Sequence, residues 1–213
     1  GMIDARHFVK LIDAIGLIQD SKAWTADDQK NMQQWVKDFL HWMQTSPIGR
    51  DEMDAPNNHG AWYDALRLSL ALYINDKVLA KKIVQNAQVR LDTQMNDKGR
   101  FPREMERTTS LHYSTFVMDA FVTIAQMSDE VGIDMWKYTS PSGKSIRKAF
   151  DEMKPYLTQE KKWDGEQIKD FEFDEGYMLL MEGQRHFNCK DCIQSVKTMA
   201  GDKASRLRIN LFY

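Results

Sequence analysis

Two separated stretches of this sequence gather side chains that can hold an anion or move a proton. The first reads Asn57-Asn-His-Gly-Ala-Trp-Tyr63, and the second reads Arg107-Thr-Thr-Ser-Leu-His-Tyr-Ser114. One side-chain amide is enough to cap a helix, so the second amide and the histidine of the first stretch suggest a further role. The candidate catalytic residues are Asn58, His59, Arg107 and Tyr113.

These residue types suit an anionic substrate whose charge must be offset during the reaction. The sequence has no serine or cysteine nucleophile motif, no HExxH, and no obvious pair of carboxylates for glycoside hydrolysis. Amide, imidazole and guanidinium donors can offset a carboxylate, while a tyrosine or histidine moves a proton. β-Elimination on a uronic-acid polymer needs both, because its C5 proton is barely acidic until the adjacent carboxylate is neutralised. We therefore predict a lyase, with a hydrolase as a distant alternative.

A basic cluster precedes the second stretch. Lys98, Arg100, Arg103 and Arg107 fall within ten positions of a chain whose formal net charge is -2. Such arginines are individually often no more than solvated surface charges. Next to the candidate catalytic residues, however, Arg100 and Arg103 are expected to bind an anionic substrate.

Aromatic and histidine side chains add further candidates for substrate binding. Trp62 and Tyr63 could stack on sugar rings, although a packed helix face explains them equally well. His7 lies near the start of the chain and could line the same cleft. His41 and His112 are interpreted as packed or surface histidines.

Helical periodicity dominates the chain and places both stretches at helix starts. Apolar stripes predict helices over about 5–18, 25–43, 60–74, 77–95, 111–131 and 142–155, with shorter helices within 174–199. Thr25 is expected to be an N-cap. Residues 46–59 and 96–110 are expected to be long loops that meet at one end of the fold. We predict an all-α protein of antiparallel helix pairs, in a bundle or an α/α toroid.

Composition excludes several classes of protein. The chain has 213 residues, 42% hydrophobic and 28% charged, as in a globular protein of one or possibly two domains. Its net charge of -2 predicts no nucleic-acid partner. No apolar run approaches the ~20 residues of a membrane span, and the first residues show no signal peptide. Cys189 and Cys192 are interpreted as a reduced pair, in preference to a redox or zinc site.

The two stretches together closely resemble the signature segments of the alginate lyase domain family. Further similar segments are Ile3-Asp-Ala-Arg-His-Phe8, Ser21-Lys-Ala-Trp24 and Gly132-Ile-Asp-Met-Trp136, so the resemblance covers nearly the whole chain. It implies a polysaccharide lyase with an α/α-toroid fold, which acts on alginate or glucuronan without a metal or organic cofactor. It also implies a periplasmic or secreted location.

The resemblance implies a role for each candidate catalytic residue. Asn58 and His59 match the pair that neutralises the carboxylate, and His59 is also a candidate base for one substrate epimer. Arg107 matches a positively charged residue near the carboxylate. Tyr113 matches the catalytic tyrosine.

The chain departs from the family in length. Members of the family carry a further N-terminal half, so residues 1–213 are expected to form a single helical domain corresponding to the C-terminal portion of an incomplete toroid. Its inner helices are then expected to expose the apolar side chains of Leu68, Leu70, Leu72, Phe116 and Phe121. We expect the chain either to self-associate through this open edge or to rearrange its N-terminal helix to cover it. The alternative to an active lyase is a catalytically impaired fragment that binds carbohydrate or is purely structural.

Overall fold

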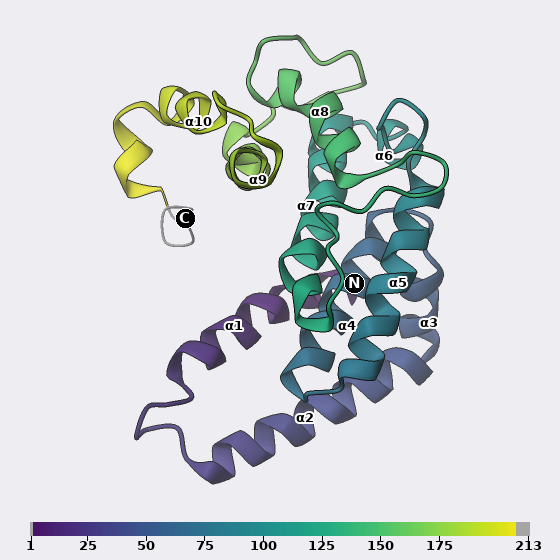
Figure 1. Cartoon of the computed structure of the whole chain (residues 1–213), viewed down its shortest axis with the longest axis vertical. Helices are drawn as coiled ribbons and strands as arrows, with labels where there is room; N and C mark the ends of the chain where they lie inside the picture. The colour runs from purple at the N-terminus through teal and green to yellow at the C-terminus, as the bar shows by residue number, and fades with distance from the viewer. Residues whose placement is uncertain (1, 208–213) are drawn as a thin grey trace. The chain divides into compact units, whose positions relative to one another are not determined.

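The structure is a computed structural model, and it describes residues 2–207 of the chain. The chain divides into two compact units, each described here by itself. Unit 1 comprises Gly1–Arg90 and Thr123–Met135, and unit 2 comprises Leu91–Val122 and Trp136–Tyr213. All regular elements of the described residues are helices, as Figure 1 shows, and this confirms the predicted all-α class.

The described residues form ten α-helices and four 3₁₀-helices. The α-helices are α1 (Phe8–Ile18), α2 (Ala26–Thr45), α3 (Pro47–Asp54), α4 (Asn58–Tyr73), α5 (Lys77–Gln94), α6 (Pro102–Met105), α7 (Ser110–Ser128), α8 (Ile146–Leu157), α9 (Tyr177–Phe187) and α10 (Cys192–Ala200). The 3₁₀-helices are η1 (Met2–His7), η2 (Asp129–Val131), η3 (Phe173–Gly176) and η4 (Gly201–Arg206). The helices predicted to begin near 60, 77 and 111 correspond to α4, α5 and α7.

The central helix of unit 1 is α4. Helices α1, α2 and α3 all contact it, and most of its side chains between Asn58 and Ala71 are buried. A helix that is buried on all its faces belongs to the core rather than to the surface. Its partners in the core cluster are Val9, Val36, Leu40 and Met43, which pack against Tyr63, Leu66 and Leu70. The first signature stretch therefore begins a helix that is fixed from several sides.

Capping residues determine where the helices of unit 1 begin. The Thr25 hydroxyl accepts from the Asp28 amide at 3.1 Å, and the Asp28 carboxylate accepts from the Thr25 amide at 2.9 Å, which confirms the predicted N-cap as a full capping box. The Ser46 hydroxyl accepts from the Gly49 amide at 3.0 Å and so caps α3, with Pro47 at the first helical position. The prediction of a continuous loop over 46–59 was therefore wrong, because Ser-Pro is a helix-start signal.

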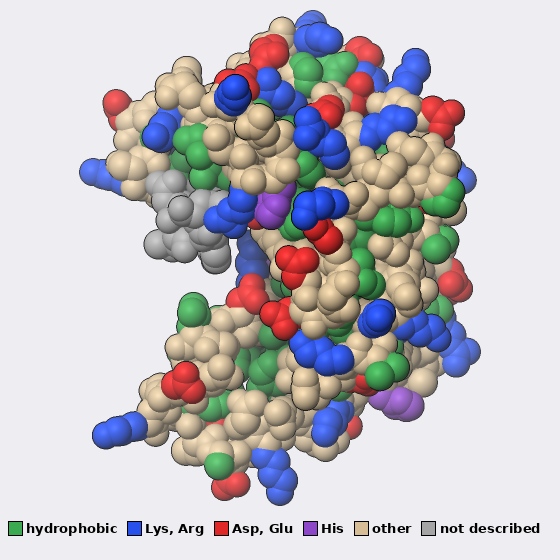
Figure 2. All heavy atoms as spheres, viewed as in Figure 1, with side chains coloured by type: hydrophobic (Ala, Val, Ile, Leu, Met, Phe, Trp, Pro, Cys, Tyr) green, Lys and Arg blue, Asp and Glu red, His purple; other side chains and the backbone are tan. Residues whose placement is uncertain are grey.

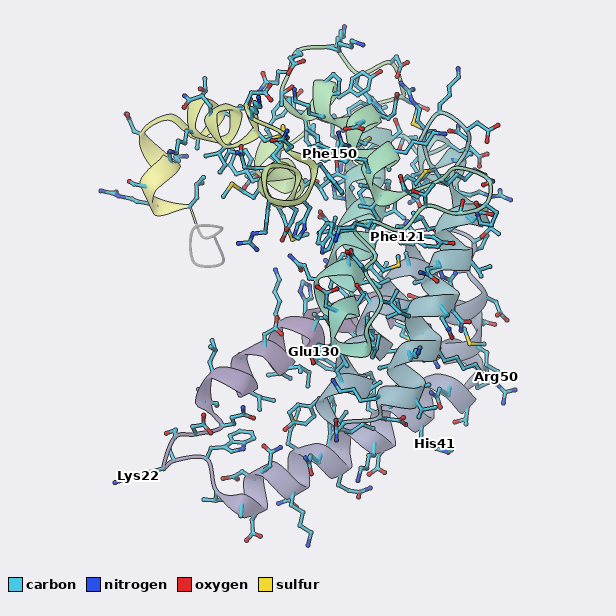
Figure 3. All side chains as sticks on the ribbon, in the orientation of Figure 1. Lys22, His41, Arg50, Phe121, Glu130 and Phe150 are labelled. Carbon is cyan, nitrogen blue, oxygen red and sulfur yellow. A yellow bond between two sulfur atoms is a disulfide. The ribbon has the colours of Figure 1, made fainter. Side chains whose placement is uncertain are left out.

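Unit 2 is built around aromatic pairs between its helices. The rings of Phe101 and Phe121 stack with their centroids 5.8 Å apart. Those of Phe150 on α8 and Phe187 on α9 lie 5.3 Å apart. Phe121 and Phe150 lie among the other side chains of unit 2 in Figure 3. Helix α9 also contacts α10, so the second unit has an apolar core of its own.

The apolar side chains expected on an open edge are largely covered. Leu68, Leu70 and Phe121 are fully buried, so the expectation of an apolar surface on these inner helices was wrong at those positions. The exposed large apolar side chains of unit 1 lie on α1, α2, α3 and α5; those on α1 and α2 are Leu11, Leu17, Ile18, Trp35 and Trp42. On the face seen in Figure 2, basic and acidic side chains are interspersed. None of the described helices is long and apolar enough to span a membrane.

Candidate active site

The two signature stretches lie in different units and are described one at a time. In unit 1, the turn between α3 and α4 ends at Asn57, whose side-chain oxygen accepts a hydrogen bond from the His59 amide at 3.2 Å. Asn57 is thus the cap, and Asn58 becomes the first residue of the helix. Asn58 is fully buried, at 0% exposure. This explains the pair of amides: one caps the helix and the other enters the core.

The imidazole of His59 is held by a carboxylate from the preceding helix. His59 Nδ1 lies 3.0 Å from Oε1 of Glu52, which belongs to α3. The His59 side chain is 38% exposed, whereas that of Glu52 is 14% exposed. A partly accessible imidazole therefore has a more deeply buried acidic partner, which the sequence analysis had not identified.

An arginine from α5 forms hydrogen bonds to the turn that precedes this histidine; we call this set of contacts the Arg90 bracket. Arg90 donates to the carbonyl oxygens of Met53 and Ala55, at 2.8 and 3.0 Å. Its Nε donates to the Asp64 carboxylate at 2.7 Å. Burial raises the pKa of Asp64, and the Arg90 charge opposes that shift. Gly60 lies so close that an added Cβ would be 2.1 Å from an Arg90 nitrogen, so the glycine makes room for the bracket.

In unit 2, the second stretch leads from α6 into α7. The amide of Ser110 and its hydroxyl both donate to the carbonyl of Glu166, at 2.9 and 2.7 Å. The indole of Trp163 donates to the same hydroxyl at 2.8 Å. The segment 163–167 therefore fixes the start of the helix that carries Tyr113.

Arg107 and Tyr113 are brought together by this turn. The central guanidinium carbon of Arg107 lies 3.7 Å from the centroid of the Tyr113 ring, in a cation–π contact. Both side chains are partly exposed. The positive charge and the transferable hydroxyl proton of this stretch thus belong to one local arrangement.

His112 also has an acidic partner. Its Nδ1 lies 2.5 Å from Oε2 of Glu175, which belongs to η3. Its ring meets that of Tyr113 edge to face at 5.1 Å and stacks with Phe116 at 6.0 Å. His112 is therefore a packed histidine, as interpreted from the sequence, with a carboxylate contact that the sequence did not reveal.

Comparisons with known proteins identify the family. The sequence model of the alginate lyase family matches residues 1–163. The chain belongs to the alginate lyase family. It is also similar to the crystal structure of an alginate lyase from Bacteroides ovatus, with 33% sequence identity and a TM-score of 0.84. No curated protein matches it.

The similarity to the Bacteroides ovatus alginate lyase covers 90% of this chain and 52% of that one, so the chain spans about half the length of that relative. The family match confirms the resemblance seen in the two signature stretches. The structural similarity also confirms the fold class, an all-α arrangement of the alginate lyase type. Membership of this family makes the chain a relative of polysaccharide lyases.

Arg100 and Arg103 were both expected from the sequence to bind substrate, but their surroundings differ. Arg100 is 15% exposed and donates to Glu152 at 2.6 Å, to Asp164 at 2.7 Å and to the Tyr156 hydroxyl at 2.7 Å. Hydrogen bonds to these carboxylates raise its pKa further. Arg103 is 64% exposed and forms a loose ion pair with Glu106, at 3.7 Å. Arg100 is therefore engaged within unit 2, and Arg103 is the more accessible of the two.

The remaining candidates belong to unit 1. Tyr63 is buried and its hydroxyl donates to the Met43 carbonyl at 2.9 Å, which makes it a core residue with no ring face available for a sugar. Trp62 is partly exposed and lines a small pocket that also includes Ile3. His7 is exposed at the end of η1. Of the two aromatics, Trp62 is the one that retains accessible surface.

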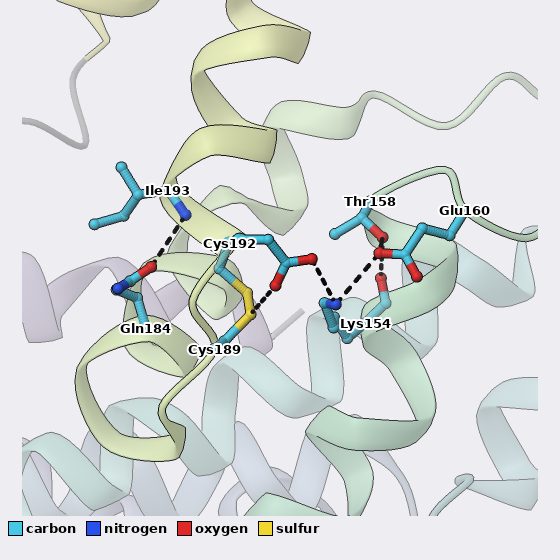
Figure 4. Close-up of a disulfide and its surroundings, with 8 residues drawn as sticks. Lys154, Thr158, Glu160, Gln184, Cys189, Cys192 and Ile193 are labelled. Carbon is cyan, nitrogen blue, oxygen red and sulfur yellow. Dashed lines mark hydrogen bonds and ion pairs between the residues drawn. A yellow bond between two sulfur atoms is a disulfide. The ribbon is translucent and has the colours of Figure 1, made fainter.

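Cys189 and Cys192 form a disulfide, which corrects the prediction of a reduced pair (Figure 4). The CxxC spacing brings their Cα atoms to 5.5 Å, within the usual range for a bridge. Asp191, between them, accepts from Lys154 at 2.8 Å and so ties the bridge to α8. These two sulfurs and Asp191 are potential metal ligands, but the disulfide occupies both sulfurs.

Proposed function

We propose that this chain is a polysaccharide lyase that cleaves a uronic-acid polymer by β-elimination. Asn58, His59 and Arg107 offset the charge of the substrate carboxylate. His59 or Tyr113 removes the C5 proton, and Tyr113 returns a proton to the departing sugar. In this step the C5–H and C4–O bonds break, a C4–C5 double bond forms, and the glycosidic oxygen leaves as a hydroxyl.

Retention of all four polar residues in a member of the alginate lyase family is the observation that carries this proposal. The local contacts support it, since the partly exposed His59 has a carboxylate partner and Tyr113 lies under a guanidinium. Stabilising the charge that develops on the carboxylate is the kind of electrostatic effect that usually dominates catalysis. Asn58 is fully buried, so its part requires a shift of the first stretch that exposes its amide.

The substrate class follows from the chemistry of the four residues. They address a carboxylate and the proton on the adjacent carbon, which alginate and β-1,4-glucuronan share. Arg103 and Trp62 are the accessible candidates for further contacts with an anionic sugar chain. We propose either polymer as the substrate.

The proposal is tested by following two products at once. Polymannuronate, polyguluronate and glucuronan are each incubated with the chain, with and without a chelator. We expect ultraviolet absorbance from unsaturated uronate to rise together with new reducing ends. Both signals should be the same with and without the chelator. Reducing ends without that absorbance would mean hydrolysis and would refute the mechanism. Binding without either product would favour the non-catalytic alternative.

We propose an oxidising location, either periplasmic or outside the cell. The disulfide between Cys189 and Cys192 supports it, because such bonds persist mainly in secreted and periplasmic proteins. Thiol titration of the protein isolated under alkylating conditions tests this. Two reactive thiols per chain would contradict it.

We also propose that two copies associate through the apolar side chains of α1 and α2. Trp35 and Trp42 are each 41% exposed, and exposed aromatic surface of this kind commonly marks an association site. Light scattering is expected to give the mass of a dimer, and a Trp35→Gln, Trp42→Gln variant that of a monomer. A monomeric starting protein would refute this proposal.

A further inference from the structure

The His59–Glu52 contact defines which nitrogen of the imidazole carries the proton. A carboxylate only accepts hydrogen bonds, so the nitrogen that faces it must be the donor. His59 Nδ1 lies 3.0 Å from Glu52 Oε1, and this is the hydrogen bond that the ring makes within the described part of the chain. In a neutral imidazole the other nitrogen is then an acceptor. His59 Nε2 is therefore the atom that can take up a proton.

We propose that Glu52 is the positioning residue of His59. It holds the ring with Nδ1 protonated and directs the basic Nε2 away from α3, and it stabilises the imidazolium once Nε2 has gained a proton. This inference rests on the proposed function, in which His59 meets a uronate carboxylate and the C5 proton. The same contact serves both roles, because protonated Nε2 becomes a donor toward the carboxylate.

The surroundings of Glu52 suit this task. Its side chain is largely buried and lines a small, mostly apolar pocket with Trp62, Tyr63 and Leu66, to which Arg6 adds one charged side chain. Hydrogen bonds are stronger where apolar groups exclude water. The contact between Glu52 and His59 is therefore expected to restrain the ring more than an ion pair at the surface would.

A purely structural role for Glu52 is less consistent with the contacts around it. Arg90 already ties the turn between α3 and α4 together through the carbonyls of Met53 and Ala55. Asn57 caps the helix that follows. These hydrogen bonds stabilise the turn without Glu52. The specific contribution of Glu52 is therefore to orient the imidazole of His59 and to set which of its nitrogens is protonated.

The protonation of each ring nitrogen can be read directly by nuclear magnetic resonance. The chain has five histidines, so labelling with ¹⁵N-histidine gives a countable set of ring signals. His59 is assigned by its loss in His59→Gln. We expect its Nδ1 to be protonated and its Nε2 unprotonated at a pH where the ring is neutral. His112, whose Nδ1 faces Glu175, is expected to show the same pattern and serves as the internal control.

Two substitutions of Glu52 distinguish the effect of its hydrogen-bond acceptor from that of its negative charge. Glu52→Met keeps the volume but removes the acceptor, so the His59 signals should move toward the Nε2-protonated tautomer while those of His112 stay. Glu52→Gln keeps an acceptor oxygen and should restore the wild-type tautomer. With a uronan substrate, turnover should fall at least about tenfold in Glu52→Met, because a wrongly protonated imidazole is a poor base. It should fall less in Glu52→Gln, with little change in KM for either.

The outcomes distinguish this inference from the proposed function. An Nε2-protonated His59 in the wild type, or an unchanged tautomer in folded Glu52→Met, would overturn the role of Glu52 even if the chain is an active lyase. A tautomer shift in Glu52→Met, reversed in Glu52→Gln, supports that role even if wild-type protein forms no unsaturated product. In that case the proposed function alone would fail. Circular dichroism of each variant shows that the helices are retained.

Discussion

The guanidinium of Arg107 lies over the ring of Tyr113, with its central carbon 3.7 Å from the ring centroid. The backbone makes this contact possible, because the Arg107 amide donates to the Glu104 carbonyl in the turn that precedes α7. A cation over an aromatic face stabilises the position of the ring. The hydroxyl at the edge of that ring is then held in place without a direct hydrogen bond from Arg107.

Tyr113→Phe separates the hydroxyl from the ring. The phenyl ring still packs under Arg107, so the fold should be unaffected and the midpoint of thermal unfolding unchanged. Formation of unsaturated product should fall about 10²- to 10⁴-fold, the usual contribution of a positioned acid or base. Tyr138→Phe, elsewhere in unit 2, is the matched control and should retain activity. Full activity in Tyr113→Phe would exclude this hydroxyl from the reaction.

A double-mutant cycle tests whether His59 and Tyr113 act in one chemical step. Residues that act together give losses that are far from additive, because the second substitution removes little once the first has stopped the step. We therefore expect His59→Gln with Tyr113→Phe to lose about as much turnover as the worse single variant. Arg50→Ala, at an exposed position of unit 1 (Figure 3), should combine additively with Tyr113→Phe. Full additivity for His59 and Tyr113 would argue for separate roles.

Substitution by methionine should affect stability at Arg100 and substrate binding at Arg103. Arg100 makes three charged or polar contacts within unit 2, so its loss should lower the free energy of unfolding by about 1–3 kcal/mol. Arg103 is exposed, and its substitution should change stability by less than about 0.5 kcal/mol. If Arg103 contacts the substrate, Arg103→Met should instead raise KM. Denaturant unfolding and initial rates measure both effects, and the reverse pattern would exchange the two assignments.

Acid should weaken unit 2 through two carboxylates. A hydrogen bond from Arg100 lowers the pKa of Asp164, and one from Lys154 lowers that of Asp191. A group whose pKa is lower in the folded state stabilises the fold above its unfolded value, about 3.9 for aspartate. That stabilisation is lost as the pH falls through the folded value.

An Asp164→Asn, Asp191→Asn variant checks this sign. It should be less stable than the wild type at pH 7, and the difference should shrink below about pH 4, where the wild-type carboxylates also become neutral. Both side chains are more than half exposed, so the effect is expected to be small. Urea unfolding at the two pH values measures it. An equal difference at both would show that the two ion pairs do not contribute.

Local signals explain what could be predicted from the sequence. Thr25 was predicted as a cap because threonine is a preferred N-cap residue and an apolar helical stripe follows it; the reciprocal bond with Asp28 was seen only in the structure. The start of α4 was placed to within two residues because amides and an apolar run adjoin there. The error at α3 was also local, since Ser46 and Pro47 carry a helix-start signal that was read as a loop.

Contacts over long sequence separations explain most of what was missed. Glu175 is 63 residues from His112, and Asp164 is 64 residues from Arg100. No periodicity or spacing indicates which acidic side chain will face a given base across such distances. The basic cluster before α7 was therefore recognised, but its acidic partners were not. Tyr63 shows the same limit, because its burial depends on the packing of α2 against α4.

The Arg90 bracket has a consequence for the entropy of substrate binding. Ordering the backbone of a flexible turn costs about 1–2 kcal/mol per residue. Because Arg90 fixes the carbonyls of Met53 and Ala55 in the folded chain, that loss occurs on folding, before the proposed substrate binds. Binding energy is then left for the reacting sugar, as in other pre-organised sites. In this way an arginine on α5, outside both signature stretches, can influence the affinity for substrate.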